Sequence, residues 1–297
     1  MTSPRLSVCL TFDFDAMSAW IGFNKSNNPT TISRGEFGAI AVPRILAMLE
    51  RNDVQATFFV PGHTALAYPG VVRQIADAGH EIGHHGWVHE NPAEFDLKGE
   101  KEIFEKGLEA LDQVAGVRPL GYRSPGCDFS PNTIDVLLEY GIVYDSSHLA
   151  TDFSAYYLRQ GDRWSRTEPY VFGTPTELVA IPFSWALDDF PHFELNPGFA
   201  TEQKAPSAVR EIWQGEFDYA YDECGGGVYD LCMHPQVTGR GSRLRMLEEL
   251  IQYMKSKEGV AFERVIDYVE RWKQLNPLES WTQANAWRLG TEPVSIS

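Results

Sequence analysis

The sequence predicts an α/β fold in which parallel strands form a sheet or a barrel. Segments typical of strands and segments typical of helices alternate about seven times along the chain. Neither a linker nor a short internal repeat divides the 297 residues, a length that suits one large domain. In folds of this class the chemistry gathers where strands end, so polar side chains at predicted strand ends are the first candidates for a site.

The predicted strands are short apolar runs rich in β-branched and aromatic residues. They cover residues 6–15, 54–60, 81–83, 120–123, 142–145, 178–181, 228–233 and 260–262. The predicted helices have amphipathic spacing and end at Gly, Pro or capping residues. They cover residues 41–51, 68–78, 97–114, 130–140, 207–224, 243–257 and 264–275.

Three segments do not follow this alternation. Residues 16–35 are rich in Gly, Asn, Ser and Thr and are too long for a simple turn, which indicates a loop at an active site or an interface. Residues 146–176 are aromatic and irregular, and we expect them to pack on the mouth of a barrel. The tail, residues 277–297, shows little periodicity, so we separate it from a catalytic domain spanning residues 1–276.

Composition bounds the partners and the compartment. A net charge of −16 argues against nucleic acid or an anionic membrane surface as a partner. No run approaches the roughly 18 apolar residues of a membrane span, and the first residues lack the features of a secretory signal. The four cysteines have no C-x-x-C spacing and predict reduced thiols, so we expect a cytoplasmic protein.

The first predicted strand ends in two carboxylates. Residues two apart on a strand face the same way, so Asp13 and Asp15 project together while Phe12 and Phe14 face the other side. Two neighbouring carboxylates at the end of a core strand repel each other, and a nearby cation or arginine relieves this repulsion.

Residues 79–91 contain four of the eight histidines. His85 and His89 stand four apart, a spacing that places two imidazoles on one face of a helical turn and within reach of one metal ion. A catalytic zinc site needs a third protein ligand and an open position for water. A carboxylate such as Asp15 supplies that ligand, and Arg123 and His234 also stand where predicted strands end.

Five motifs in this order resemble those of the polysaccharide deacetylase superfamily. They are T-F-D-F-D, G-H-E-I-G-x-H-x-x-x-H, Y-R-S-P, F-S-W-x-L-D-D and L-C-M-H-P, between residue 11 and about residue 238. The D-x-D-A, I-S-R-G and H-E-N-P segments are similar to the allantoinase and cyclic-imidase-like branch. The resemblance implies a distorted (β/α) barrel, usually of seven parallel strands.

The resemblance also implies site roles. Asp15, His85 and His89 correspond to the ligands of a divalent metal, for which zinc is our first choice and iron, cobalt or nickel are alternatives. Asp13 corresponds to the general base and His234 to the general acid that protonates the leaving nitrogen.

The same motifs imply supporting roles around this centre. Arg123 corresponds to the arginine that pairs with the base, and the N–H of Gly126 to the oxyanion donor. Asp188 or Asp189 would orient His234. Trp185 would wall the pocket, and Trp20, from the early loop, would help to cap it.

The remaining histidines have competing interpretations. We expect His80 to make a structural hydrogen bond, and His84, about 100° around a helix from His85, to lie behind the ligands or at the surface. His63 fits a helix start or the pocket equally well. His148 and His192 lie in aromatic loops where they could touch substrate.

The functional prediction is a metal-dependent hydrolase of non-peptide C–N bonds. We favour a small cyclic amide or imide over acetylated amino sugars such as peptidoglycan or chitin, because the aspartates are not adjacent and the turn at residues 123–126 lacks the tyrosine of the usual R-P-P-Y pattern. A non-catalytic metal- or ligand-binding barrel is the alternative from another class. Homo-oligomers, often tetramers, are common in the branch that the chain resembles.

Overall fold

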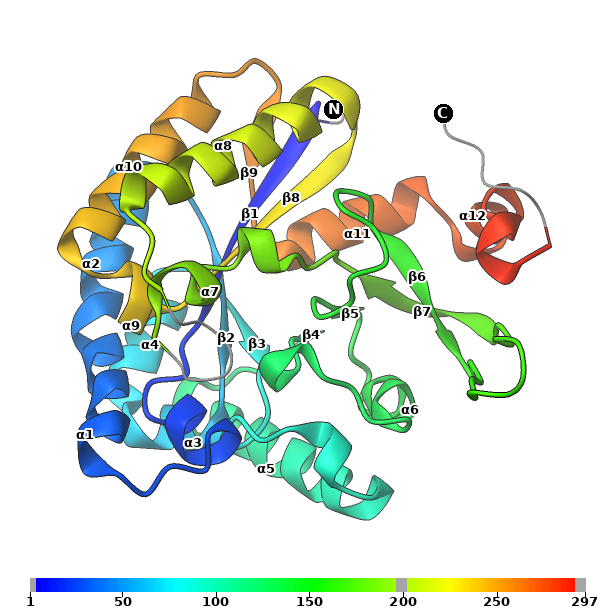
Figure 1. The fold of residues 1–297 in the computed structure, drawn as a ribbon, viewed down its shortest axis with the longest axis horizontal. Helices are drawn as coiled ribbons and strands as arrows, with labels where there is room; N and C mark the ends of the chain where they lie inside the picture. The colour runs from blue at the N-terminus through cyan, green and yellow to red at the C-terminus, as the bar shows by residue number, and fades with distance from the viewer. Residues whose placement is uncertain (1–3, 196–201, 292–297) are drawn as a thin grey trace.

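The computed structural model describes residues 4–195 and 202–291. Within these ranges the strands form one curled sheet in the order β6-β7-β5-β4-β3-β2-β1-β8, and β9 pairs with β1 beside this path (Figure 1). The strands are β1 (Leu6–Asp13), β2 (Thr57–Val60), β3 (Glu81–His84), β4 (Gly121–Tyr122), β5 (Tyr144–Asp145), β6 (Tyr156–Gln160), β7 (Thr174–Ala180), β8 (Gly227–Met233) and β9 (Val260–Phe262).

Strand β1 is the centre of the sheet. All eight of its residues are buried, and it pairs in parallel with β2, β8 and β9. A strand covered on both faces must be apolar on both, which explains why the L-S-V-C-L-T-F run continues without alternation until its terminal aspartate. The carboxyl ends of β1, β2, β3 and β8 therefore meet at one end of the sheet.

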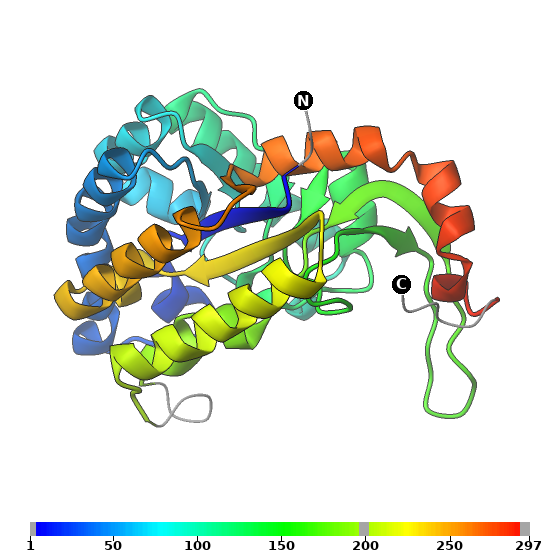
Figure 2. The same cartoon turned by 90° about the horizontal axis from the view of Figure 1, so that it is seen from above.

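Helices cover the outside of the curled sheet (Figures 1 and 2). The longer ones are α2 (Phe37–Arg51), α4 (Pro69–Asp77), α5 (Leu97–Ala115), α8 (Pro206–Glu223), α10 (Gly241–Lys255) and α11 (Val265–Leu275). The short ones are α1 (Pro29–Ile32), α3 (Gly62–Ala67), α6 (Thr133–Glu139), α7 (Phe190–Phe193), α9 (Pro235–Thr238) and α12 (Leu278–Ala284). Single helical turns are η1 (Ala19–Phe23), η2 (Ser33–Glu36), η3 (Pro92–Glu94), η4 (Pro125–Cys127), η5 (Trp185–Leu187) and η6 (Ala286–Leu289).

The predicted distorted barrel is confirmed. Seven described strands pair in parallel along the path from β7 to β8. The strands at the two ends of this path, β7 and β8, do not form a ladder within the described residues; a single parallel bridge joins Cys232 of β8 to Asp188, in the segment after β7. The sheet is thus an incompletely closed barrel, and its open seam lies beside the predicted site residues.

Two segments differ from the sequence prediction. Residues 146–176 contain β6, which pairs antiparallel with β7 and forms a hairpin that projects from the body (Figure 2). The tail after Pro277 is helical in α12 and η6, and Trp281 packs against Tyr157 and Trp272. None of the described helices is long and apolar enough to cross a bilayer.

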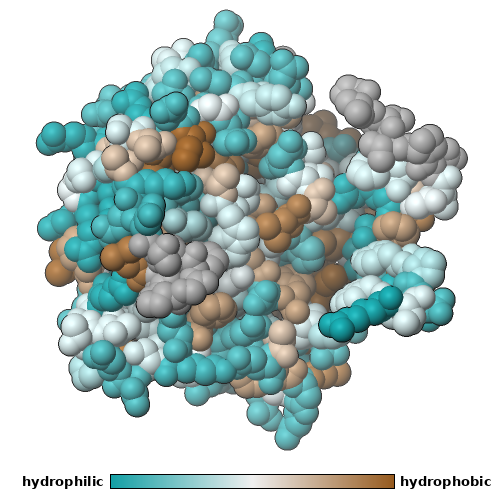
Figure 3. All heavy atoms as spheres, viewed as in Figure 1, coloured by the Kyte–Doolittle hydropathy of each residue, from teal (hydrophilic) through white to brown (hydrophobic). Residues whose placement is uncertain are grey.

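The surface is mixed in character. Apolar residues gather near the middle of the face seen in Figure 3, whereas its periphery is mostly hydrophilic. The apolar core lies between the sheet and the helices and includes the buried side chains of β1, β2, α2 and α10.

Candidate active site

The two aspartates of the first strand lie together at its carboxyl end. Asp13 is the last residue of β1, and Asp15 follows two positions later; both side chains are buried. Phe12 and Phe14 are fully buried on the other side, as the two-residue alternation predicts. The strand therefore delivers two carboxylates to one buried position.

His85 and His89 converge on Asp15, although the segment between them is not helical. His85 follows β3 directly, and His89 has a left-handed backbone with φ of 61°. The Nε2 atoms of His85 and His89 lie 3.4 and 3.8 Å from Asp15 Oδ1. The ligand set was predicted from a helical spacing, but a loop after a strand brings the imidazoles together.

The chemistry of these three residues fits a divalent cation. His85 Nδ1 lies 2.6 Å from the Arg123 carbonyl oxygen, which only accepts, so Nδ1 carries the proton and Nε2 presents a lone pair. His85 Nε2 and Asp15 Oδ1 are buried, and neither has a hydrogen-bond partner within the described ranges. Two buried acceptors that face each other need a positive charge between them.

The protonation tendencies of the same residues agree with this interpretation. Burial alone would raise the pKa of Asp15, but His89, His85 and His234 lower it to about 2. Burial lowers the pKa of His89 to about 4, so this imidazole is neutral, as a metal ligand must be. Burial also opposes the charging of His85, yet Asp13 and Asp15 outweigh it and raise its pKa, which marks a position that attracts a cation.

A buried guanidinium holds Asp13. Arg123 Nη1 donates to Asp13 Oδ1 at 2.9 Å, and Arg123 Nη2 donates to Asp230 Oδ2 at 2.8 Å. Ser146 accepts from the guanidinium through its backbone carbonyl and its hydroxyl, at 2.9 and 2.7 Å. Thr11 completes the network with a hydroxyl that donates to Asp230 Oδ1. Arg123 is thereby fixed from three sides, and Asp13 Oδ2 stays turned toward His85 and His234.

His234 follows β8 and faces the aspartates across the cavity. Its Nε2 lies 4.0 Å from Asp13 Oδ2 and 3.7 Å from Asp15 Oδ2, and its Nδ1 lies 2.7 Å from Asp189 Oδ1. Burial would lower the pKa of His234, but Asp189 and Asp188 outweigh burial and raise it well above the usual value. Asp189, rather than Asp188, is the residue that orients this imidazole.

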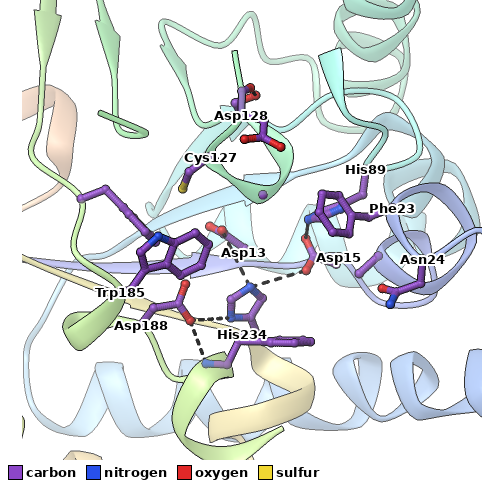
Figure 4. Close-up of a pocket in the computed structure, with 15 residues that line it drawn as sticks. Asp13, Asp15, Phe23, Asn24, His89, Cys127, Asp128, Trp185, Asp188 and His234 are labelled. Atoms are coloured by element: carbon purple, nitrogen blue, oxygen red, sulfur yellow. Dashed lines mark hydrogen bonds and ion pairs between the residues drawn. The ribbon is translucent and has the colours of Figure 1, made fainter. Parts of the chain in front are cut away.

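Asp13, Asp15, His89 and His234 line a cavity of about 310 Å³ (Figure 4). In Figure 4 the side chains of Asp13, Asp15, His89 and His234 point toward one another, with Phe23 on one side and Trp185 on the other. Gly126 also lines the cavity, with φ of 63°. A β-carbon at Gly126 would stand 2.6 Å from the Phe23 ring, so this position requires glycine.

Several predicted pocket residues lie elsewhere. Trp20 is buried against Phe190, with Arg34 over its ring, and does not line the cavity. The prediction that Trp20 caps the pocket is therefore wrong, because the η1 turn directs Phe23, and not Trp20, into the cavity. His148 bonds Asp145, and His192 lies 2.9 Å from the Ala186 carbonyl oxygen; neither lines the cavity.

The other histidines support the scaffold. His84 is fully buried in β3 and stacks on Phe104 with ring centroids 4.1 Å apart. Its predicted position at the surface or behind the ligands assumed a helix, whereas alternation along a strand turns it into the core. His80 accepts a hydrogen bond from the Ala56 N–H, as expected. His63, in the first turn of α3, faces Ser18 and Trp87 outside the cavity lining.

Asp230 is the main site residue that the sequence analysis missed. It stands in the middle of β8, a buried run that is otherwise apolar, and a lone carboxylate in such a run is itself a signal of a buried partner. Asp188, Cys232 and His234 also bring three donor atoms close together. That group fits a metal less well, because burial raises the pKa of the Cys232 thiol well above its usual value and His234 Nδ1 is engaged by Asp189.

Comparison with known proteins places this geometry in a family. The family model described as polysaccharide deacetylase matches residues 2–144. The chain is 34% identical over 293 residues to the peptidoglycan deacetylase of Helicobacter pylori, which covers 93% of this chain and 99% of that protein.

Solved structures agree. A protein from Mycobacterium smegmatis assigned to the polysaccharide deacetylases superposes with a TM-score of 0.80 and 32% identity, over 100% of this chain and 96% of that chain. The PuuE allantoinase superposes with a TM-score of 0.75 over 92% of each chain, and at 24% identity this likeness concerns the fold alone. The chain therefore belongs to the polysaccharide deacetylase family, whose members are hydrolases of carbon–nitrogen bonds other than peptide bonds.

Proposed function

We propose that the protein hydrolyses the C–N bond of a small cyclic amide or imide with the help of one divalent metal ion. The observation that carries this proposal is the position of Phe23. Its ring stands over Gly126 and meets the His89 ring edge to face, at a centroid distance of 5.9 Å. The cavity of about 310 Å³ next to the candidate ligands is at the lower end of the range of ligand pockets, which favours a small substrate.

Asp15, His85 and His89 would hold the metal, and we propose zinc, with iron, cobalt or nickel as alternatives. When bound, such an ion lowers the pKa of a coordinated water and polarises the substrate carbonyl. The lone pair of His85 Nε2 and the unpartnered Asp15 Oδ1 support this assignment.

Asp13 would take the proton of the attacking water. Its Oδ1 is engaged by Arg123, and its Oδ2, which has only a long contact of 3.7 Å from the Cys232 thiol, would accept that proton. His234 would carry the proton to the leaving nitrogen from Nε2, because Asp189 fixes the opposite ring nitrogen and favours the charged imidazole. The Gly126 N–H would donate to the oxygen that becomes negative as water adds.

The second candidate is N-deacetylation of an acetylated amino sugar. It is supported by the relative from Helicobacter pylori, which is named a peptidoglycan deacetylase. The same residues would serve, since both reactions break an amide C–N bond. The two candidates differ in what the cavity must admit: one small ring, or one unit of a longer chain.

One experiment separates them. The purified protein is incubated with succinimide, hydantoin and acetylated chito-oligosaccharides, and ring absorbance and released acetate are followed in parallel. Ring opening without acetate supports the proposal, and acetate without ring opening replaces it by the second candidate. Metal analysis of the same sample reports the ion.

Phe23→Ala tests the role of the wall. We expect kcat/KM for the small ring to fall roughly fivefold, because an aromatic contact contributes about 1 kcal/mol. Phe95→Ala, at an exposed ring outside the cavity lining, is the matched control and should leave the rate unchanged. Equal rates for Phe23→Ala and wild type would remove the argument from cavity size.

A cytoplasmic location and a homo-oligomer, with a tetramer as the expected form, complete the proposal. Four free thiols are compatible with a reducing compartment. The projecting hairpin exposes Trp164, Tyr170 and Phe172, a set of rings that a neighbouring subunit could cover. Light scattering after size-exclusion chromatography tests the oligomer, and cell fractionation tests the location.

A further inference from the structure

Two adjacent carboxylates, Asp188 and Asp189, follow the η5 turn and differ in how many hydrogen bonds they accept. Asp189 Oδ1 accepts from His234 Nδ1 at 2.7 Å. Asp189 Oδ2 accepts from the His234 backbone N–H at 2.9 Å and from the Thr238 hydroxyl. Both oxygens of Asp189 are therefore occupied, and this residue alone suffices to hold His234.

Asp188 is left with an acceptor that the fold does not use. Its Oδ1 accepts from the Phe190 N–H at 2.7 Å, while His234 Nδ1 is 3.8 Å away with its proton already directed to Asp189. Within the described ranges no donor reaches Asp188 Oδ2. The side chain is only 3% exposed, yet it lines the cavity, and Figure 4 shows its carboxyl group beside Trp185 and His234.

A buried carboxylate with one hydrogen bond is poorly compensated for lost hydration. Burial is the main reason that the pKa of Asp188 is raised, to about 7, with His234 opposing the rise. A donor that entered the cavity with a ligand would supply the missing hydrogen bond.

Asp188 and His234 border the same cavity. Asp13 and Asp15 lie on the Nε2 side of that imidazole, and Asp188 lies on its Nδ1 side. The leaving nitrogen approaches Nε2, and the Asp188 carboxyl group lines the same cavity beside the ring, so a substrate that fills the cavity meets both groups.

We infer that Asp188 accepts a hydrogen bond from an N–H on the leaving-nitrogen side of the substrate, and that the site selects amides and imides that carry this N–H over their N-alkylated analogues. This inference rests on the proposed amide hydrolysis. Asp188 is a specificity-determining residue, distinct from Asp189, which acts through His234.

The test compares two substrate pairs on wild type and on Asp188→Asn. The pairs are succinimide with N-methylsuccinimide, followed by ring opening, and acetanilide with N-methylacetanilide, followed by acetate release. Asp188→Asn can keep the hydrogen bond to the Phe190 N–H through its oxygen, but it presents an N–H to the cavity in place of an acceptor. Thermal unfolding and bound metal, measured on both proteins, check that the variant is folded and loaded.

For the wild type we expect kcat/KM to favour the N–H member of the pair that it hydrolyses. At about pH 8.5, above the pKa of about 7 so that Asp188 is mostly ionised, Asp188→Asn should lower kcat/KM for that member roughly 10- to 100-fold and leave the N-methyl member within about twofold, as expected for a lost hydrogen bond to a charged group. An unchanged preference, or an equal loss on both members, would overturn the inference.

The two substrate pairs also separate this inference from the proposed function. If the wild type releases acetate but opens no ring, the cyclic substrate class is wrong, and the acetanilide pair still decides the role of Asp188. If the wild type hydrolyses neither pair, both proposals are overturned together.

Discussion

Arg123 determines how the candidate base is presented. Its guanidinium is fully buried between Asp13 and Asp230, at 2.9 and 2.8 Å, so two carboxylates and one cation share a position that is almost closed to solvent. Removing one member of such a set leaves the others uncompensated, which is why buried pairs act as a unit. One oxygen of Asp13 is immobilised in this network, and the other is aimed at the cavity.

Asp13→Asn tests this division of labour. The amide has nearly the shape of the carboxylate but cannot accept a proton from water, so we expect kcat to fall about 10²- to 10⁴-fold. Metal content, measured by elemental analysis, should stay equal to that of wild type, because Asp13 is not among the three candidate ligands. Full activity in this variant would remove Asp13 as the base.

The direction of a side chain was predictable where the residue lies in a strand with its two-residue period, and less so where it lies in a loop. The shared direction of Asp13 and Asp15 was predictable from the two-residue alternation of a strand. The convergence of His85 and His89 was predicted correctly from a wrong helical assumption, because both residues come soon after the end of β3. His84 was misplaced for the same reason. Asp230 was overlooked because its partner, Arg123, is 107 residues away in the sequence.

At the scale of elements, the packing of α5 on the loop after β3 fixes the histidine segment. Gly107, in the middle of α5, faces His84, and a β-carbon there would stand 2.3 Å from His84 Nε2 and 2.9 Å from the Gly86 carbonyl oxygen. The helix can lie this close only because residue 107 has no side chain.

We therefore expect Gly107→Ala to destabilise the fold, by about 1–3 kcal/mol, as an overpacked core does. Gly215→Ala is the matched control, since it lies in the interior of α8 with open space around it and should be neutral or stabilising by up to about 1 kcal/mol. Chemical denaturation of both variants gives the comparison. Equal stabilities would show that α5 is free to shift away from His84.

Elements that the sequence analysis missed have ambiguous local patterns. Residues Tyr156–Gln160 form β6, but their Y-Y-L-R-Q sequence is too short to show alternation, and its antiparallel partner β7 comes after a long hairpin. Helix α12 has no fully buried residue, so its sequence carries almost no periodic apolar signal. Long helices and buried parallel strands were predictable because each carries a continuous apolar pattern.

At the scale of the whole molecule, a neutral buried histidine makes stability depend on pH. His80 is buried and accepts a hydrogen bond from the Ala56 N–H, and burial lowers its pKa to about 4 from a usual value of 6.5. Between these two values the unfolded chain binds a proton that the folded chain excludes, so stability falls as the pH falls through this window.

His80→Gln removes this titration while keeping a side-chain acceptor. The free energy of unfolding of wild type, relative to this variant, should decline between about pH 6.5 and pH 4 by on the order of 3 kcal/mol and then level off. Denaturation curves at several pH values supply the difference, and groups common to both proteins cancel. If the difference in the free energy of unfolding between the two proteins were constant across this range, His80 would have the same pKa in the folded and the unfolded chain.

The whole fold should also gain stability from the metal. His85 Nε2 and Asp15 Oδ1 lie 3.4 Å apart in the interior, and a positive charge between them, either a second proton on His85 or a metal ion, is needed to compensate their burial. A ligand that binds only the folded chain stabilises it by about 2.7 kcal/mol at a free concentration of 100 times Kd, so a chelator should lower Tm by several degrees and added zinc should restore it.

His85→Ala should abolish both changes in Tm and bind no metal. His148→Ala, which removes an imidazole that pairs with Asp145 outside the cavity, should keep both changes. Stoichiometric metal in His85→Ala would mean that the ion is held elsewhere, and the proposed ligand set would have to be abandoned.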